Sequence, residues 1–342
     1  MAVTDGAPPT LVVTQAEVAK LLPMDECIDA MAATLSALAR GEAILPLRTI
    51  LWLPERVGAL GLMPGALMGE GVLGLKAITL FPGNEGTDVD THQGAVLLFE
   101  AKRGSLVAVI DATSITAIRT AAVSGVATRA LANEDAGDLA LIGSGVQART
   151  HLQAMLRVRK IRRVRVASRS FDNARAFAER ESARRGIRVE PVRDFREAVE
   201  GADLICTTTS AREPVVRGAW ISPGAHLNAV GSSVPFAREL DTEAVRRSRL
   251  YVDRRESALN EAGDFLIPKK EGALGDDHIV GEVGEVLTGR TPGRRSREEI
   301  TLFKSLGLAI EDVAAAKHIY EKARRSASGR FLDLGGHRNE AD

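Results

Sequence analysis

The sequence predicts an α/β fold in which a doubly wound parallel sheet is joined to a second, discontinuous α+β domain. Three observations support this prediction: a glycine-rich turn directly after a buried strand, alternating strand and helix segments after that turn, and a long mixed segment before it. Strands that alternate with helices are typical of a parallel sheet covered on both faces. A chain of 342 residues has room for two domains.

The glycine-rich turn lies in residues 138–148, which read DLALIGSGVQA. Gly143, Gly145 and Ala148 match G-x-G-x-x-G/A, the pattern between the first strand and first helix of a Rossmann-type domain. Gly143 permits the tight turn, Gly145 leaves room for a pyrophosphate, and Ala148 lets the helix pack close to the strand. We therefore expect a bound dinucleotide, with a purely structural turn as the alternative.

The segments after this turn continue the alternation. The next helix is expected to carry Leu152, Met155 and Leu156. Further strands are expected over residues 164–167, 187–190, 203–208, 225–230 and 249–253, and further helices over residues 173–185 and 194–200. This order predicts a parallel sheet whose ligand site lies outside the carboxyl ends of its strands.

The tip of the second strand indicates which nicotinamide cofactor is preferred. An acidic residue there, roughly 20 residues past the glycine turn, would bind the ribose 2′-hydroxyl of NAD. This chain instead has Ser168, Arg169 and Ser170. A guanidinium pairs with a phosphate through two hydrogen bonds, and no carboxylate is present to repel that phosphate. The sequence thus favours NADP(H) over NAD(H), and a solvent-exposed Arg169 without a ligand is the structural alternative.

The segment before the turn predicts a helix, several strands and a second, longer helix. The first helix is expected over residues 17–39, where apolar residues recur at helical spacing. Strands are expected over residues 47–53, 59–68, 72–80, 94–100 and 105–110, and the last two form a hairpin through residues 101–104. An alanine-rich helix over residues 114–132 then leads into the dinucleotide-binding domain.

A further helical segment near the C-terminus, residues 302–320, indicates that the chain returns to the first domain. We therefore expect the first domain to comprise residues 1–115 with 307–335. The dinucleotide-binding domain is expected to comprise residues 116–306.

Charge and composition exclude several classes of partner. Lys+Arg and Asp+Glu each number 45, so the chain has no basic field for nucleic acid or an anionic membrane. No apolar run approaches the ~18 residues of a membrane-spanning helix. Cys27 and Cys206 provide neither a disulfide framework nor the spacing of a metal site. These features predict a cytoplasmic protein without a structural metal.

Seven longer segments are spread over nearly the whole chain. They are PLRTIL (46–51), GLKAITLFPGN (74–84), THQGAVLLFEAKRG (91–104), DATSITAIRTAAVSGVATR (111–129), ALIGSGVQAR (140–149), AHLNAVGSS (225–233) and ITLFKSLGLAIEDVAAA (300–316). Together they resemble the ornithine cyclodeaminase/mu-crystallin family. The resemblance implies a homodimer whose first domain carries the dimer interface and the substrate pocket. Activities in the family include cyclodeamination of ornithine or lysine, alanine dehydrogenation and reduction of cyclic ketimines.

The resemblance also assigns residues to two sites. Arg48, Lys76 and Arg119 fit the positions that bind the substrate carboxylate, Lys76 and Arg119 are implied to be catalytic, and Ser233 is a fourth substrate-binding position. The implied cofactor-binding residues are Thr113, Gly143, Ser144, Gly145, Val146, Gln147, Ser168, Arg169, Ser170, Thr207, Thr208, Thr209, Val230, Gly231, Lys304 and Ser305. A lysine inside an apolar strand, such as Lys76, is costly unless it is paired. Arg119 is expected to anchor the substrate, so that its replacement by leucine greatly raises KM or abolishes turnover but leaves the fold and cofactor binding intact.

One position departs from the cyclodeaminase pattern. In cyclodeaminases an aspartate two residues before a proline acts at the substrate amine, but here Ser233 stands at that place in GSSVP (231–235). A serine cannot supply the negative charge that stabilises an ammonium group. Glu256 is the alternative source of this charge. The segments RELD (238–241) and YVD…GDFL (251–266) instead resemble the mu-crystallin-like ketimine reductases.

The sequence therefore predicts reduction of an imino acid to an L-amino acid by hydride transfer from NAD(P)H. A cyclic ketimine such as Δ1-pyrroline-2-carboxylate, or a related α-imino acid, is the expected substrate. Three alternatives remain: a cyclodeaminase-type lyase with bound NAD(H), an amino-acid dehydrogenase resembling alanine dehydrogenase, and a non-catalytic binding protein.

Overall fold

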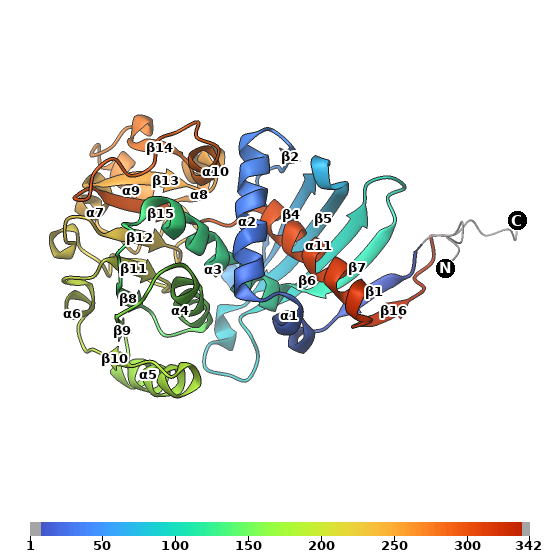
Figure 1. Ribbon diagram of the computed structural model, residues 1–342, viewed down its shortest axis with the longest axis horizontal. Helices are drawn as coiled ribbons and strands as arrows, with labels where there is room; N and C mark the ends of the chain where they lie inside the picture. Colours follow the sequence, from blue (N-terminus) through green and yellow to red (C-terminus); the bar gives the residue numbers. More distant parts are fainter. Residues whose placement is uncertain (1–7, 337–342) are drawn as a thin grey trace, which may run out of the picture. The chain divides into compact units, whose positions relative to one another are not determined.

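The computed structural model describes residues 8–336 and shows two compact units (Figure 1). Unit 1 contains the residues up to Arg119 and those from Leu308 onward, and unit 2 contains Thr120 to Gly307. Each unit is built on its own eight-stranded sheet. The α/β class predicted from the sequence, with one doubly wound sheet and one mixed sheet, is confirmed.

The sheet of unit 2 is parallel throughout. Its strands are β8 (Asp138–Ile142), β9 (Arg163–Ala167), β10 (Val189–Pro191), β11 (Leu204–Thr207), β12 (His226–Ala229), β13 (Ser248–Val252), β14 (Ile279–Glu282) and β15 (Ile300–Lys304). They lie in the order β10-β9-β8-β11-β12-β15-β13-β14. The chain first builds outward from β8 to β10 and then continues from β11 on the other side of β8. Ligands of parallel α/β sheets bind at such a switch point, outside the carboxyl ends of the strands.

Three helices of unit 2 begin at residues whose side chains accept hydrogen bonds from the first backbone N–H groups. The helices of this unit are α4 (Val146–Val158), α5 (Phe171–Arg185), α6 (Phe195–Val199), α7 (Thr242–Arg246), α8 (Arg255–Glu261), α9 (Gly263–Lys270) and α10 (Val283–Leu287). The side chains of Ser170, Asp194 and Asp241 accept hydrogen bonds from the backbone at the starts of α5, α6 and α7. Short polar side chains at this position are strongly preferred because they replace missing helical partners.

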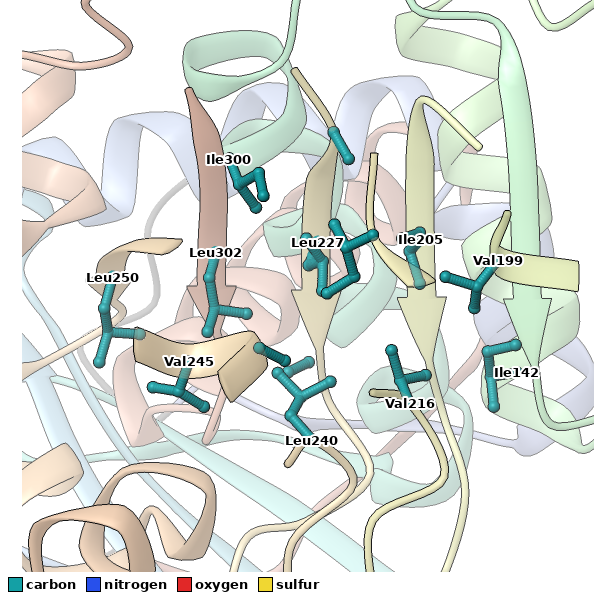
Figure 2. Packing of buried hydrophobic residues seen from close by; sticks show 14 of the residues in the cluster. Ile142, Val199, Ile205, Val216, Leu227, Leu240, Val245, Leu250, Ile300 and Leu302 are labelled. Atoms are coloured by element: carbon teal, nitrogen blue, oxygen red, sulfur yellow. The ribbon is translucent and has the colours of Figure 1, made fainter. Parts of the chain in front are cut away.

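The core of unit 2 lies against its central strands (Figure 2). Ile205, Leu227 and Leu302 come from the adjacent strands β11, β12 and β15, and each is fully buried. Figure 2 shows these side chains in one layer with Leu240 and Val216. Full burial of each such side chain contributes about 1.5–3 kcal/mol. These buried side chains hold the central strands in place. The loops that form the candidate cofactor site begin at the carboxyl ends of these strands.

The sheet of unit 1 is mainly antiparallel. Its strands are β1 (Thr10–Val13), β2 (Ala43–Ile44), β3 (Thr49–Trp52), β4 (Ala59–Leu67), β5 (Val72–Leu80), β6 (His92–Glu100), β7 (Leu106–Asp111) and β16 (Arg330–Leu332). The order is β16-β1-β7-β6-β5-β4-β2, with β3 paired to β4. Only β1 and β7 pair in parallel among the described strands of this sheet.

A long helix, α11 (Ala309–Ser326), packs across β4, β5 and β6 of unit 1 (Figure 1). Gly65 and Gly74 are cross-strand partners on β4 and β5. A Cβ at Gly65 would lie 3.1 Å from the Ala309 side chain, and one at Gly74 would lie 2.9 Å from Val313. This glycine pair therefore allows the first turns of α11 to approach the sheet closely.

Several predicted boundaries of helices and strands are wrong. Residues 17–39 form two helices, α1 (Gln15–Leu21) and α2 (Met24–Ala39), because Pro23 lacks an N–H and disfavours helical geometry in the residue before it. The predicted helix over residues 302–320 starts as strand β15 and becomes α11 only at Ala309. Strand β3 begins at Thr49, so Arg48 immediately precedes it. The strands β1, β2, β14 and β16 were not predicted.

The other expected elements are present with boundaries that differ by one or a few residues. The alanine-rich helix is α3 (Ala112–Leu131). Between residues 8 and 336, no helix has both the length and the hydropathy needed to cross a membrane.

Candidate functional sites in the two units

The turn after β8 has the geometry that a dinucleotide requires. Gly143 has φ +112°, and a Cβ at this residue would lie 2.9 Å from the carbonyl oxygen of Thr208. Only glycine fits such a conformation without strain. A Cβ at Gly145 would meet no atom within 4 Å, so there is open space beside this residue. The turn thus presents an uncovered stretch of backbone at the switch point of the sheet.

The N-terminus of α4, immediately after Gly145, suits an anionic group. This helix has 13 residues and no acidic side chain in its first turn. The unpaired N–H groups and the dipole of a helix N-terminus favour negative charge. Val146 is exposed, and the side-chain oxygen of Gln147 is buried without a hydrogen-bond partner. These residues fit the pyrophosphate of a nicotinamide dinucleotide, with Ser144 beside them on the turn.

The tip of β9 carries the three residues predicted to select the cofactor. The hydroxyl of Ser168 accepts a hydrogen bond from Ser144 at 3.1 Å, which links this tip to the glycine turn. The hydroxyl of Ser170 accepts from the backbone N–H of Asn173 and caps α5. Arg169 is exposed. Ser170 therefore has a structural role, whereas Ser168 and Arg169 lie at the strand tip, where the ribose of a dinucleotide binds in folds of this type.

The loops after β11 and β12 are tied together by one buried carboxylate, that of Glu239. It accepts hydrogen bonds from the Thr207 hydroxyl (2.7 Å), the Thr209 backbone N–H (2.6 Å), the Thr209 hydroxyl (2.8 Å) and the Gly231 backbone N–H (2.7 Å). A Cβ at Gly231 would lie 2.1 Å from the Thr209 carbonyl oxygen, so the two loops are in tight contact. The predicted residues Thr207, Thr209 and Gly231 are thus brought together by a residue that was not among them.

A second carboxylate, Asp264 at the start of α9, supports Glu239. It accepts hydrogen bonds from the backbone N–H groups of Glu239 (2.8 Å) and Leu240 (2.9 Å). Its other oxygen is 3.0 Å from the Lys304 ammonium, which also donates to the carbonyl of Ala229. Burial and then the charge of Asp264 raise the pKa of Glu239, while Lys304 and the surrounding donors lower it. Lys304 is thus a buried partner of Asp264, so its ammonium stabilises the strand ends from inside.

The remaining residues implied for the cofactor lie on several elements. Thr208 donates its backbone N–H and its hydroxyl to Ile142 beside the glycine turn. Ser305 follows β15 and is buried, and Val230 follows β12 and is half-buried. Thr113 lies in unit 1, where its hydroxyl donates to the carbonyl of His92.

In unit 1, two of the predicted substrate cations form a buried cluster with two carboxylates. The Lys76 ammonium is 2.8 Å from Asp312 Oδ2. Arg119 Nε is 2.9 Å from Asp312 Oδ1, and Arg119 Nη1 is 2.8 Å from Glu311 Oε2. Lys76 is 2% exposed and Arg119 is 3% exposed, and both carboxylates are completely buried. Pairing of this kind is what makes buried charges tolerable.

The surroundings of Lys76 lower the pKa of its ammonium group. Burial lowers the pKa of Lys76 most, Asp312 opposes this shift, and the charges of Arg119 and Arg48 add to it, so that the pKa of Lys76 is about 8. The ammonium also lies 3.4 Å from the Thr116 hydroxyl. Arg48 is half-buried and close enough to Lys76 for its charge to act there. The charges of two predicted cations, Arg48 and Arg119, therefore act on the third, Lys76.

Sequence reasoning missed Glu311 and Asp312 as well as Glu239 and Asp264. A signal for the first pair is present, because two adjacent acids interrupt the apolar run LGLAIEDVAAA. Charged residues are almost never buried unless they are paired, so such an interruption predicts a cation nearby. Which cation pairs with these two acids depends on contacts between residues that are 192 or more positions apart in the sequence.

Ser233 lies in the loop that follows Gly231 and is half-buried. Glu256, the alternative source of a negative charge, is at the start of α8 and forms an ion pair with Arg254. Among residues 8–336, no group of three or more His, Cys, Asp or Glu side chains has the arrangement of a metal site.

A dinucleotide-type turn on a parallel sheet and a buried cluster of lysine, arginine and carboxylates define a class of two-unit α/β proteins. A model of the ornithine cyclodeaminase/mu-crystallin family matches residues 9–327. The chain therefore belongs to the ornithine cyclodeaminase/mu-crystallin family, and the resemblance seen in its sequence is confirmed.

Comparisons with individual proteins support this family assignment. The chain is 42% identical to mouse ketimine reductase mu-crystallin over 294 residues, which cover 86% of this chain and 90% of that protein. It is 42% identical to Thermococcus litoralis Δ1-pyrroline-2-carboxylate reductase, solved with NADH and L-proline, with a TM-score of 0.91 and coverage of 94% and 99%. It is 36% identical to an archaeal alanine dehydrogenase dimer with bound NAD, with a TM-score of 0.90 and coverage of 95% and 99%.

Proposed function

We propose that the protein is an NAD(P)H-dependent reductase that converts an α-imino acid, such as Δ1-pyrroline-2-carboxylate, into the L-amino acid. One observation carries this proposal: a single buried carboxylate, Asp312, holds Lys76 and Arg119 side by side, with Arg48 nearby. Fixed cations of this kind suit the carboxylate of an amino or imino acid. The similarity to a ketimine reductase and to a pyrroline-2-carboxylate reductase supports this substrate class.

The two units would have separate tasks in this reaction. In unit 2, the turn from Gly143 to Gln147 and the tip of β9 would hold the dinucleotide, and the loops tied by Glu239 would cover it. The bound nicotinamide supplies the hydride that the imine carbon accepts. In unit 1, Arg119 and Arg48 would bind the substrate carboxylate. Lys76 would share this contact and hold a proton toward the imine nitrogen, and fixing both reactants contributes much of the rate.

Direct assay tests this function against its nearest alternative. We expect the purified protein to oxidise NADPH with Δ1-pyrroline-2-carboxylate, faster at mildly acidic pH because a protonated imine accepts hydride more readily. With ornithine we expect no ammonia and no proline, because Ser233 provides no negative charge for the substrate amine. Ser233→Asp should slow imine reduction by binding the product amine more tightly. Ammonia release from ornithine by the unaltered protein, with the amount of NAD(H) unchanged, would instead identify a lyase.

An amino-acid dehydrogenase is the second candidate, because the alanine dehydrogenase structure is so similar. Pyruvate with ammonia, tested in the same assay, separates the two. Faster NADPH oxidation with pyruvate and ammonia than with the cyclic imine would favour the dehydrogenase.

We further propose that NADP(H) is preferred over NAD(H). Arg169 is exposed at the tip of β9, no acidic residue lies among residues 168–170, and the Ser168 hydroxyl is oriented by Ser144. Arg169→Asp should weaken NADPH binding by about 10- to 100-fold, since a charge-assisted contact contributes about 1.5–3 kcal/mol. NADH binding should change little, and Arg175→Asp, at an exposed arginine of α5, is the control. Equal affinity of the unaltered protein for NADH and NADPH, measured by fluorescence titration, would contradict the assignment.

We propose a homodimer formed through unit 1. All four residues of strand β3 are exposed, and its pairing partner is β4. Among the described residues, eight of the fourteen exposed large hydrophobic side chains belong to one stretch: Ile44, Ile50, Leu51, Trp52, Leu53, Val57, Met68 and Leu73. Such a concentration of apolar surface is typical of an interface. The archaeal alanine dehydrogenase is a dimer, and light scattering of the purified protein tests the same assembly here.

We also propose that the protein is cytoplasmic. Cys27 and Cys206 are both buried and unbonded, and a chain with only two unbonded cysteines suits a reducing compartment. Fractionation of cells that express the protein tests this location.

A further inference from the structure

Asp312 is a completely buried carboxylate whose two oxygens contact two different cations. Oδ1 accepts from Arg119 Nε at 2.9 Å, and Oδ2 is 2.8 Å from the Lys76 ammonium. Glu311, the preceding residue, contacts Arg119 through Oε2 at 2.8 Å. No ion pair joins Glu311 to Lys76 among the described contacts. Two adjacent acids of α11 therefore have separable roles.

The backbone explains why these carboxylates reach the cations. Lys76 follows Gly74 by two residues on β5, so both face the same side of the sheet. The glycine pair Gly65–Gly74 lets the first turns of α11 approach that side closely. Asp312 stands in this part of α11, next to Val313, whose side chain lies against Gly74. The position of the carboxylate is therefore fixed by packing.

Without this carboxylate, the two cations would repel each other in a buried environment. Like charges a few Å apart interact strongly where water is excluded, and each then favours the neutral form or the displacement of the other. Arginine keeps its proton in proteins, so the lysine is the member of the pair that would lose its charge.

We propose that Asp312 is a positioning residue of the reaction, which holds the Lys76 ammonium and the Arg119 guanidinium together so that both face the substrate carboxylate. Glu311 orients Arg119 through its contact with Nη1. This inference rests on the proposed function, because it assigns roles within that substrate site. It brings helix α11, which otherwise serves the packing of unit 1, into the substrate-binding machinery.

The charged groups around Lys76 determine how the loss of Asp312 changes the pKa of Lys76. Asp312 on α11 favours the ammonium form, whereas Arg119 on α3 and Arg48 before β3 oppose it. His92 on β6 is also near, but its surroundings and the Lys76 charge lower its pKa, so it is neutral at pH 7. Glu311 is next to Asp312 but contacts Arg119 instead. With Asp312 neutralised, the pKa of Lys76 falls below its present value of about 8.

The test compares Asp312→Asn with Glu311→Gln, two neighbouring variants that each remove one charge with little change of shape. The probe is pyrrole-2-carboxylate, a planar carboxylate whose charge does not change between pH 6 and pH 10, titrated into protein saturated with NADP⁺. In the unaltered protein, binding should weaken as pH rises through about 8, where Lys76 loses its proton. In Asp312→Asn, this loss should occur about one pH unit lower or more. In Glu311→Gln, affinity should fall but the midpoint should stay in place.

A third variant, Asp312→Glu, keeps the charge but moves it by one methylene. It should bind the probe less tightly with an unchanged midpoint, and it replaces Asp312→Asn if the asparagine variant does not fold. Equal midpoints in Asp312→Asn and the unaltered protein, or the same downward shift in Glu311→Gln or in Asp312→Glu, would overturn the proposal. Failure of the unaltered protein to bind the probe or to reduce imines would instead refute the proposed function.

Discussion

Replacing Arg119 by leucine is expected to abolish imine reduction and to destabilise the fold at the same time. Arg119 is 3% exposed and pairs with two completely buried carboxylates, those of Glu311 and Asp312. Removing one partner of a buried ion pair leaves an uncompensated charge, which costs about 3–5 kcal/mol. Urea unfolding should show a loss of stability of that order. The kcat/KM for the imino acid should fall by roughly 10²- to 10³-fold or more, since the substrate carboxylate loses the same contact.

A double variant separates these two effects. Adding Glu311→Gln to Arg119→Leu neutralises a buried carboxylate that pairs with Arg119, so part of the lost stability should return. Imine reduction should remain lost, because no guanidinium is restored for the substrate. Recovery of turnover together with stability would show that Arg119 only maintains the fold. Unchanged kcat/KM in Arg119→Leu would remove this residue from the substrate site.

The sequence alone led to a different expectation for this variant, in which Arg119 served the substrate and the fold stayed intact. The difference arises because periodicity and motif spacing describe neighbours along the chain. Glu311 and Arg119 are 192 residues apart, and only the close approach of α11 to the sheet at Gly65 and Gly74 brings this region together. The presence of a buried lysine and arginine could be predicted, whereas their partners depended on this long-range packing.

The parallel sheet was more accessible to sequence reasoning, because most of its strands are short, rich in apolar residues and largely buried. The apolar run before Gly143 and its match to the nucleotide-binding pattern located the first strand of this sheet. The break at Pro23 could also have been predicted, since proline marks a helix start. The strand β15 was harder to predict, because a short apolar run such as Ile300–Lys304 fits a buried strand and a buried helix equally well.

For the loops after β11 and β12 as well, sequence reasoning does not reveal contacts between residues from different segments. Thr207, Thr209 and Gly231 were implied by the family resemblance and lie at or just after the ends of expected strands, and RELD (238–241) was noticed as a family pattern. The hydrogen bonds that Glu239 of this segment makes to all three residues follow only from the folded chain. Residues that position a site are thus less visible in a sequence than residues that line it.

Replacing Glu239 by alanine is therefore expected to weaken cofactor binding more than replacing any single loop hydroxyl. Glu239 is completely buried and is the shared acceptor for four donors on the loops after β11 and β12. Each buried donor left without a partner costs about 1–3 kcal/mol. The loops should separate, the affinity for NADPH should fall by roughly tenfold or more, and kcat/KM should fall with it. Fluorescence titration with NADPH and thermal unfolding measure the two effects.

Thr207→Val is the matched control for this experiment. It has nearly the same shape and removes one of the four hydrogen bonds, so it should cost about 1 kcal/mol and leave the loops held by the other three. Glu239→Gln should lie between the two, because its amide nitrogen faces donors that it cannot satisfy. If Glu239→Ala lowers stability but binds NADPH as tightly as the unaltered protein, the carboxylate only supports the core. A loss of affinity that grows from Thr207→Val through Glu239→Gln to Glu239→Ala would show that these hydrogen bonds hold the loops in the form that binds the cofactor.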